Sequence, residues 1–553
     1  MPATPKSLRK LWRNCLLICG LLLWLPACAA DGMGEDSSSS YPPSSNGMDN
    51  NYDNNNNSWA PDSDNSVGAP NSPSDPWDVA PEVEERADYR TPVSSGQYVF
   101  VADSASDILV ILDTQSLSIK MVETGLNPTH VVPLGNAGRV AVLATHSNEV
   151  TIVSVSDDFE ISDETVSVRA DTNALAPSPN GDFVIAFWDD LFEDPKAAPQ
   201  TNQDISILDL RQATPLVAHT IVGVRPREIV YSQDGDRAFV ITETSIEIID
   251  LMRLDKPFIP DSVRLFEDPF LDPTLLEMAI DPSGTVAIGR RDDVPEITVA
   301  WLDGSDARRT YALSSPPTDL DLAPDGSFGL ITLRHDQIVA VFELPLPDDD
   351  ATDPFTWIPL GELNCGAAVL FPDSSGAALY TTVSQSEDDL KMLTILQRTP
   401  KGWAQTSRLL NRAIRAIVPA PDSETLFVHH TPLASHPSQM RWSYTLVKLP
   451  GLQTKFQQLD IQPEQLLITP QGHTAYLNVS DSNVFRVDAI DLQTFIIENI
   501  YLGSLPTSLG YTATTDQIFI AQQHTAGRMT FVDQGDGSTR TVTGFILNNE
   551  LTH

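Results

Sequence analysis

The sequence predicts an all-β protein in which one small antiparallel sheet recurs along the chain. The first observation is a repeated turn, in which an Asp-Gly, Asn-Gly or Ser-Gly pair separates two apolar segments and supplies the backbone freedom of a tight hairpin. The second is spacing, because ten such turns recur at a mean of about 47 residues, close to the length of a four-stranded propeller blade. The third is that no long amphipathic helical pattern follows residue 88. We therefore expect a β-propeller of four-stranded antiparallel blades, with about ten repeat units closing as one ring.

The ten turns differ in how clearly they stand out. In the clearest ones a glycine-containing polar turn lies between two apolar strands, at Pro177–Phe187 (PSPNGDFVIAF), Tyr231–Ile241 (YSQDGDRAFVI), Ile280–Arg290 (IDPSGTVAIGR), Leu322–Thr332 (LAPDGSFGLIT) and Ile468–Asn478 (ITPQGHTAYLN). Weaker versions lie near Gly96, Gly138, Gly376, Ser423 and Thr515.

A second signal follows each turn, an alternating strand that ends at an aspartate. The predicted unit is therefore strand, glycine turn, strand, loop, strand, aspartate turn and strand. A short acceptor at a turn binds backbone amides two residues on, so we expect the aspartates to hold hairpins rather than to form a catalytic ring. They are Asp113, Asp209, Asp250 and Asp491.

The number of repeat units allows more than one way of closing the ring. Ten units exceed the four to eight blades that are typical, so a single large ring, two rings, or a smaller ring with decorations all fit, and we favour one ring. The first unit shows no clear opening strand, whereas Ser538–Leu547 has strand character at the end of the chain. We expect a terminal strand from one end to complete a blade begun at the other.

The hairpins resemble the YVTN type of β-propeller repeat of exported bacterial proteins. Gln97–Asp113 (QYVFVADSASDILVILD) and Thr474–Leu492 (TAYLNVSDSNVFRVDAIDL) carry this resemblance, which covers residue 89 to the end, although the literal tetrad never occurs. The resemblance implies the propeller fold and export. Because propellers of this type also include enzymes, it does not assign an activity.

The amino-terminal segment predicts export. A basic cluster that includes Lys6 and Arg13 precedes the apolar run Leu16–Leu25, which has the length of a secretory signal. Leu25-Pro26-Ala27-Cys28 resembles a bacterial lipobox, in which the cysteine is acylated and becomes the mature amino terminus. The alternative is ordinary signal-peptidase cleavage, because Ala27-Cys28-Ala29 also has the small-x-small pattern. We favour lipidation of Cys28.

Domain organisation follows from composition. Residues 1–27 form the predicted signal peptide with lipobox, and residues 28–88 form a Ser-, Asn-, Pro- and Asp-rich tether with too few apolar residues to fold. Such a tether has an end-to-end distance of about 40–45 Å. Residues 89–553 form the repeat domain. Because Cys15 and Cys19 leave with the signal, no disulfide framework is available, and Cys365 is expected to be a small buried filler.

Charge and motifs exclude several functions. The 34 Lys and Arg residues against 75 Asp and Glu give a net charge of −41, which excludes nucleic acid as a partner. The histidines lack metal-ligand spacing, and the adjacent pair His429-His430 points to opposite strand faces, so we expect these two to be solvated at a loop or strand end. No Gly-x-Ser-x-Gly elbow or phosphate loop is present. The acidic clusters Asp348–Asp350 and Asp533–Ser538 are predicted to be solvated turns rather than calcium sites. No catalytic, cofactor-binding or metal-binding residue is assigned.

These observations favour a non-enzymatic, exported binding domain, anchored by lipid to the bacterial cell envelope, with a protein, peptide or glycan ligand. The outer membrane is the favoured location, with a periplasmic or secreted protein as the alternative. A lactonase-like hydrolase, or an enzyme similar to quinoprotein dehydrogenases with a central-channel site, is the first alternative function. A scaffold of an envelope complex is the second.

Overall fold

The computed structural model describes the propeller and a short segment near the amino terminus. The described residues are 22–24, for which only the backbone is described, and 88–189, 203–212, 214–243, 245–254, 259–266, 276–292, 294–305, 307–347, 353–382, 391–434 and 440–545, with side chains also undescribed at 433, 434 and 440. Several predictions fall outside them. These concern Cys28, nearly all of the tether, Asp348–Asp350 and His436.

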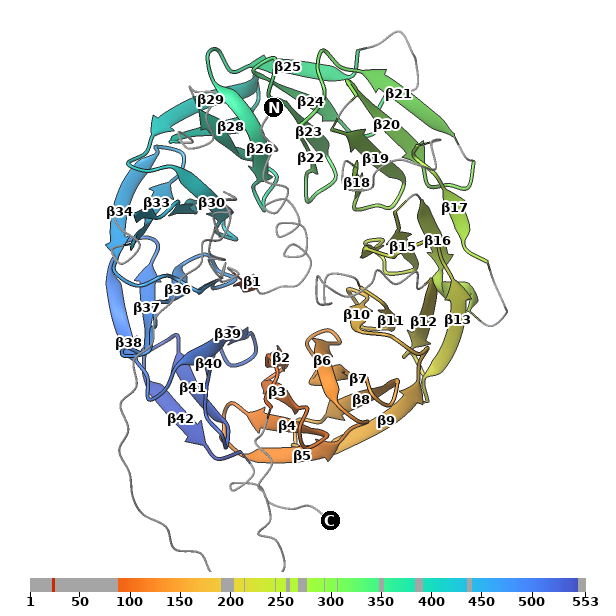
Figure 1. Ribbon diagram of the computed structural model, residues 1–553, viewed down its shortest axis with the longest axis vertical. Helices are drawn as coiled ribbons and strands as arrows, with labels where there is room; N and C mark the ends of the chain where they lie inside the picture. Colours follow the sequence, from red (N-terminus) through yellow and green to blue (C-terminus); the bar gives the residue numbers. More distant parts are fainter. Residues whose placement is uncertain are drawn as a thin grey trace, which may run out of the picture. The chain divides into compact units, whose positions relative to one another are not determined.

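Ten antiparallel blades follow one another around a single ring (Figure 1). Within each blade the strands run in sequence order from the centre of the ring to its rim, and consecutive strands pair. The predicted fold, blade architecture and single ring are confirmed.

The strands of the first five blades have these bounds. Blade 1 comprises β2 (Val93–Ser95), β3 (Tyr98–Asp103), β4 (Ile108–Asp113) and β5 (Ile119–Glu123). Blade 2 comprises β6 (Pro128–Pro133), β7 (Arg139–Ala144), β8 (Glu149–Val155) and β9 (Ile161–Ser167). Blade 3 comprises β10 (Ala174–Pro177), β11 (Phe183–Phe187), β12 (Asp204–Asp209) and β13 (Leu216–Ile221). Blade 4 comprises β14 (Glu228–Tyr231), β15 (Arg237–Ile241), β16 (Ile246–Asp250) and β17 (Asp261–Val263), with the 3₁₀ turn η4 (Leu251–Arg253) after β16. Blade 5 comprises β18 (Leu276–Ile280), β19 (Val286–Arg291), β20 (Glu296–Trp301) and β21 (Arg308–Ala312).

The remaining five blades continue in the same order. Blade 6 comprises β22 (Asp319–Leu322), β23 (Phe328–Leu333), β24 (Ile338–Glu343) and β25 (Phe355–Pro359). Blade 7 comprises β26 (Asn364–Leu370), β27 (Gly376–Thr382), β28 (Met392–Thr399) and β29 (Gly402–Leu409). Blade 8 comprises β30 (Ile414–Pro419), β31 (Thr425–His430), β33 (Met440–Lys448) and β34 (Gln453–Leu459), and β32 (Leu433–Ala434) pairs with β33. Blade 9 comprises β35 (Gln465–Ile468), β36 (Thr474–Asn478), β37 (Arg486–Asp491) and β38 (Ile497–Tyr501). Blade 10 comprises β39 (Pro506–Thr512), β40 (Gln517–Gln522), β41 (Arg528–Asp533) and β42 (Thr539–Thr543).

Two further features concern the leader and membrane spans. The backbone of β1 (Leu22–Trp24), in the predicted signal peptide, pairs antiparallel with β35. No helix in the described part of the chain is long and apolar enough to cross a membrane.

The glycine turns join the first and second strands of the blades, as predicted. Seven of them place a glycine at φ between 63° and 75°, the left-handed region in which other residues are strained: Gly96, Gly138, Gly181, Gly235, Gly284, Gly326 and Gly472. In the other three turns this conformation falls on Ser374, Ser423 and Asp516 instead. Gly376 opens β27, where an added Cβ would lie 2.1 Å from the carbonyl oxygen of Leu396.

The aspartates that end the third strands act as turn acceptors, which confirms the sequence prediction. In each, Oδ1 accepts a hydrogen bond from the backbone N–H two residues on. The bonds are Gln115 to Asp113 at 2.9 Å, Arg211 to Asp209 at 3.1 Å, Met252 to Asp250 at 3.0 Å and Gln493 to Asp491 at 2.8 Å.

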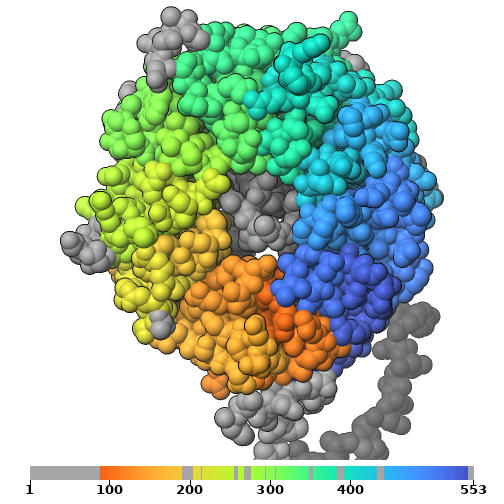
Figure 2. Space-filling model, turned by 180° about the vertical axis from the view of Figure 1, so that it is seen from behind, coloured from red at the N-terminus to blue at the C-terminus, as the bar shows by residue number. Residues whose placement is uncertain are grey.

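The prediction that an exchanged terminal strand closes the ring is wrong. Blade 1 has its own opening strand, β2, and blade 10 has its own outer strand, β42, so each terminal blade is built from consecutive strands. The two blades lie side by side, as the orange and blue ends of the ring show in Figure 2. Ser94 Oγ donates to the carbonyl oxygen of Tyr511 at 2.7 Å, and Arg540 donates to that of Thr114 at 2.8 Å. The ring therefore closes through packing and side-chain hydrogen bonds.

The core lies between the blades rather than at the centre of the ring. Each of the ten junctions contains one buried apolar cluster that draws its residues from the two blades that meet there. Cys365 is fully buried between blades 6 and 7, as predicted, and burial raises the pKa of its thiol. Because apolar packing fills the junctions, a polar group inside one stands out.

Candidate functional site

The adjacent histidines of β31 are placed differently from the prediction. They do point to opposite faces, because neighbouring Phe427 belongs to the cluster between blades 8 and 9 and Val428 to the one between blades 7 and 8. They are not solvated: His429 is 4% exposed and His430 is 2% exposed. The pair does lie at a strand end, since His430 is the last residue of β31, but solvation was predicted wrongly because blades 7 and 9 pack against the two faces of this strand.

Burial keeps both imidazoles neutral. Burial, reinforced by the charges of His430 and Arg415, lowers the pKa of His429 to about 3, and burial lowers the pKa of His430 to about 4. His430 Nδ1 lies 3.2 Å from the carbonyl oxygen of Ala413, which can only accept, so Nδ1 carries the proton. Nε2 therefore accepts from the Thr445 hydroxyl at 2.6 Å.

We expect His430 to make the protein sensitive to acid. Its pKa is lowered in the folded state, so its contribution to stability is complete above pH 6.5 and is lost as the pH falls towards 4. At pH 5 the loss relative to pH 7 amounts to about 2 kcal/mol of unfolding free energy. Urea unfolding at both pH values, with His430→Gln as the comparison, measures it. An equal loss in the variant and in the parent protein would contradict this assignment.

The predicted acidic turn after β41 is confirmed. Asp533 Oδ1 accepts from the backbone N–H of Gly535 at 2.8 Å, and Asp536 Oδ1 accepts from that of Ser538 at 2.8 Å. The described histidines lie in several different blades, and in the described ranges no three His, Cys, Asp or Glu side chains are grouped so that they could hold a metal ion.

A buried charged cluster lies on the inner strands of blades 5 and 6. The guanidinium of Arg290, whose side chain is 3% exposed, pairs with Glu277 and Asp292. Its Nη1 and Nη2 donate to the carbonyl oxygens of Pro317 and Thr318 at 3.0 and 2.8 Å. These bonds join blade 5 to the strand that opens blade 6, so we interpret the cluster as a brace.

The nearby carboxyl of Asp319 has a raised pKa of about 6, because burial and the charge of Glu277 outweigh the Ala368 backbone N–H and Arg290. As the pH falls, the Asp319 carboxyl therefore binds a proton at a higher pH in the folded state than in the unfolded state. Through Asp319, stability falls as the pH rises through 6.

One position in the third strand is polar in most blades. It is the residue that pairs with the fourth residue of the second strand, for example Asp488 with Leu477. The polar residues at this position, all buried, are Thr151, Ser206, Glu247, Thr298, Thr394, Thr445, Asp488 and Thr530. Blades 1 and 6 have Val110 and Ala340 instead. The position thus holds a hydroxyl in six blades and a carboxylate in two.

In four of the other blades this polar group is satisfied within its own sheet. Thr151 bonds Thr165 at 3.0 Å, Thr394 bonds Ser407 at 2.9 Å, and Thr530 bonds Thr541 at 2.7 Å. Glu247 accepts from Ser245 at 2.6 Å and from Ser262 at 3.1 Å. Asp488 has no such hydroxyl partner among the described residues.

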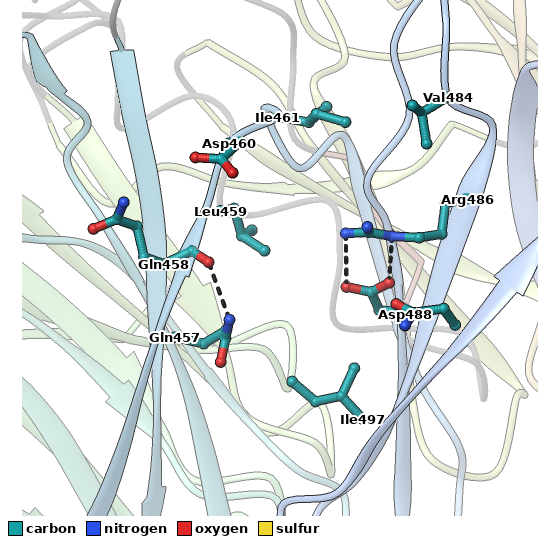
Figure 3. A pocket seen from close by; sticks show the side chains of 10 residues that line it. Gln457, Gln458, Leu459, Asp460, Ile461, Val484, Arg486, Asp488 and Ile497 are labelled. Carbon is teal, nitrogen blue, oxygen red and sulfur yellow. Dashed lines mark hydrogen bonds and ion pairs between the residues drawn. The ribbon is translucent and has the colours of Figure 1, made fainter.

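Asp488 instead faces Arg486 at a pocket (Figure 3). Arg486 Nη2 donates to Asp488 Oδ2 at 3.3 Å, and Nε lies 2.7 Å from Oδ1. The second contact is an ion pair, but its angle leaves both Nε and Oδ1 without an aligned hydrogen bond. Asp488 is 4% exposed and Arg486 is 26% exposed. Burial raises the pKa of Asp488, and Arg486 partly opposes this shift.

The pocket has a volume of about 420 Å³ and lies at the outer part of the junction between blades 8 and 9. Blade 8 and the connection after it supply one wall: Gln457, Gln458, Leu459, Asp460 and Ile461. Blade 9 supplies the other: Val484, Arg486, Asp488, Ile497 and Asn499. We call these residues the junction pocket.

A row of polar side chains extends inward from the junction pocket. Strand pairing puts His429 beside Tyr444 and Tyr444 beside Gln457, so all three lie on one face of blade 8. This face turns towards blade 9, because Tyr444 packs in the cluster that the two blades share. The Tyr444 hydroxyl and His429 Nε2 are buried, and neither has a hydrogen-bond partner in the described structure. Burial and the charge of Asp488 raise the pKa of Tyr444.

Sequence reasoning missed this site. In β37 the sequence pattern singles out Asp491, the turn aspartate, and not Asp488. A usable signal was present, since Val487, Ala489 and Ile490 surround Asp488 with apolar residues. A carboxylate in the middle of such a strand is costly unless it has partners.

Comparison with known proteins finds likeness to solved structures at low sequence identity. No protein family and no curated protein matches the sequence. Among solved structures, dihydro-heme d1 dehydrogenase NirN, in complex with DHE, is 14% identical with a TM-score of 0.39, over 74% of this chain and 73% of its own. A eukaryotic initiation factor is 9% identical with a TM-score of 0.46, over 76% and 96%. AztD from Citrobacter koseri is 11% identical with a TM-score of 0.36, over 67% and 96%.

Proposed function

We propose that this protein is an exported, lipid-anchored binding protein whose ligand occupies the junction pocket. The observation that carries the proposal is a pocket of about 420 Å³ that contains an ion pair with a buried carboxylate and with free hydrogen-bonding capacity. Its volume falls in the range of roughly 300–1,000 Å³ that is usual for small-ligand sites. Buried polar atoms normally have partners, so a bound polar ligand accounts for those without one at this junction.

The binding proposal is tested with purified protein that begins at the predicted mature amino terminus. A mixed library of peptides and oligosaccharides is screened by thermal shift, because a ligand that binds only the folded state raises the melting temperature. We expect at least one class to stabilise the parent protein and to lose its effect in Asp488→Thr. Turnover of the bound compound would contradict the non-enzymatic part of the proposal.

The predicted anchor at Cys28 gives a second test. The four residues Leu25–Cys28 resemble a lipobox, and the YVTN-like repeats are typical of exported bacterial proteins. Cells fed a fatty-acid analogue are expected to label the parent protein and Cys365→Ala, and to lose all label in Cys28→Ala. Label that persists in Cys28→Ala would show that another residue is acylated and that the lipobox prediction is wrong.

A further inference from the structure

We infer that the ligand of the junction pocket is a neutral saccharide. This inference rests on the binding function proposed above. It follows from three properties of the pocket: planar side chains that both donate and accept hydrogen bonds, the state of its charges, and an exposed aromatic ring in register with the ion pair.

The polar groups of the pocket match vicinal hydroxyls. A sugar hydroxyl donates one hydrogen bond and accepts others, and neighbouring hydroxyls do so at a fixed spacing. Asp488 Oδ1 can accept and Arg486 Nε can donate, and the two atoms lie 2.7 Å apart. The side-chain amides of Gln457 and Asn499, one on each wall, both donate and accept.

The charges of the pocket favour a neutral ligand. Arg486 is the only cation among the described lining residues, and it is already paired with Asp488. The other lining charge, Asp460, pairs with Arg441. An anionic sugar would therefore meet no unpaired cation in the described pocket, and the protein carries a net charge of −41.

Apolar groups provide surfaces for the C–H faces of a sugar ring. Ile461 and Val484 line the pocket beside the polar groups, and Ile497 lies on the blade 9 wall (Figure 3). Tyr501 pairs with Arg486 across β37 and β38, so it lies on the same face of blade 9. Tyr501 is 72% exposed, which leaves its ring available for stacking.

The geometry favours a saccharide over a peptide. Peptides that add to a sheet bind along an unpaired strand edge through main-chain hydrogen bonds. The junction pocket is instead bounded by side chains from two facing sheets. The row of polar side chains that extends inward from the pocket offers one more donor. The Tyr444 hydroxyl can donate to a further hydroxyl of the saccharide or to a water that the ligand orders.

The experiment uses arrays of oligosaccharides built from glucose, galactose, mannose and N-acetylglucosamine, their uronate counterparts, and a peptide library. Hits are measured by titration calorimetry. We expect a neutral oligosaccharide to bind, with affinity lowered about thirtyfold in Asp488→Thr and about fivefold in Tyr501→Ala. Threonine is the residue that five other blades hold at this position.

A matched control separates the pocket from the general fold. Arg528 opens β41 as Arg486 opens β37, but it bonds Thr543 of β42 and Ser504 in the connection before β39, and it does not line the pocket. Arg486→Gln should weaken saccharide binding about tenfold, whereas Arg528→Gln should leave it unchanged.

Three outcomes overturn the inference in distinguishable ways. If only peptides bind, and Asp488→Thr abolishes their binding, the saccharide inference fails and the proposed binding function stands. If saccharides bind equally well to Asp488→Thr, the site is wrong. If neither class binds, the inference and the proposed function fail together.

Discussion

Replacing Arg290 with methionine is expected to lower the free energy of unfolding by about 3–5 kcal/mol. The guanidinium pairs with Glu277 and Asp292 and donates to the carbonyl oxygens of Pro317 and Thr318. Its removal takes away the cation that pairs with both carboxylates and donates to both carbonyl groups, and the loss of one partner of a buried ion pair is far more destabilising than the loss of a surface pair. Urea unfolding at pH 7 measures the change.

The control for Arg290 is a surface arginine of the same ring. Arg398 pairs with Glu343 at 2.7 Å, and the two side chains are 38% and 60% exposed. Arg398→Met should therefore cost less than about 1 kcal/mol. Equal effects of the two substitutions would show that the buried cluster does not brace blades 5 and 6.

The features predicted from the sequence are those that local chemistry determines. The turn glycines and the strand-ending aspartates each act within a few residues. Their pattern therefore predicts the four-stranded blade, and the number of repeats predicts a ring of ten blades. Closure was predicted wrongly because β2 is short and polar (Val93-Ser94-Ser95) and because the contacts that join blades 1 and 10 link residues that are distant in the sequence. No local pattern reports such contacts.

The junction pocket escaped prediction for the same physical reason. Gln457 and Asp488 belong to different blades, and only the radial packing of the two sheets brings them to one cavity. Burial of His429 likewise depends on the packing of blade 9, about which the sequence of β31 itself gives no information. Comparison of equivalent positions between repeats is more informative. It shows carboxylates, Asp488 and Glu247, where six blades have threonine or serine, and of these two Glu247 has hydroxyl partners in its own sheet.

The double variant Asp488→Thr, Tyr444→Phe is expected to be more stable than the parent protein by about 2–4 kcal/mol, while losing its ligand. Burial raises the pKa of Asp488, which shows that its charge is costly in the fold, and the Tyr444 hydroxyl is buried without a partner in the described structure. Threonine is the residue of the neighbouring blades at this position, and phenylalanine keeps the ring that stacks on Phe427. Arg486 stays 26% exposed and can be hydrated when it loses its partner.

The measurement is urea unfolding without ligand. The control removes a polar group at the equivalent position of blade 10, where that group has hydrogen-bond partners. Thr530 bonds Thr541 and Gln522, so Thr530→Val should lower stability by about 1 kcal/mol rather than raise it. Removing a polar group that lacks a partner in the absence of ligand stabilises the protein. Removing a polar group that is hydrogen-bonded within the fold destabilises it. A loss of stability in the double variant would mean that Asp488 and Tyr444 serve the fold of blades 8 and 9, and the ligand would then have to be sought elsewhere on the ring.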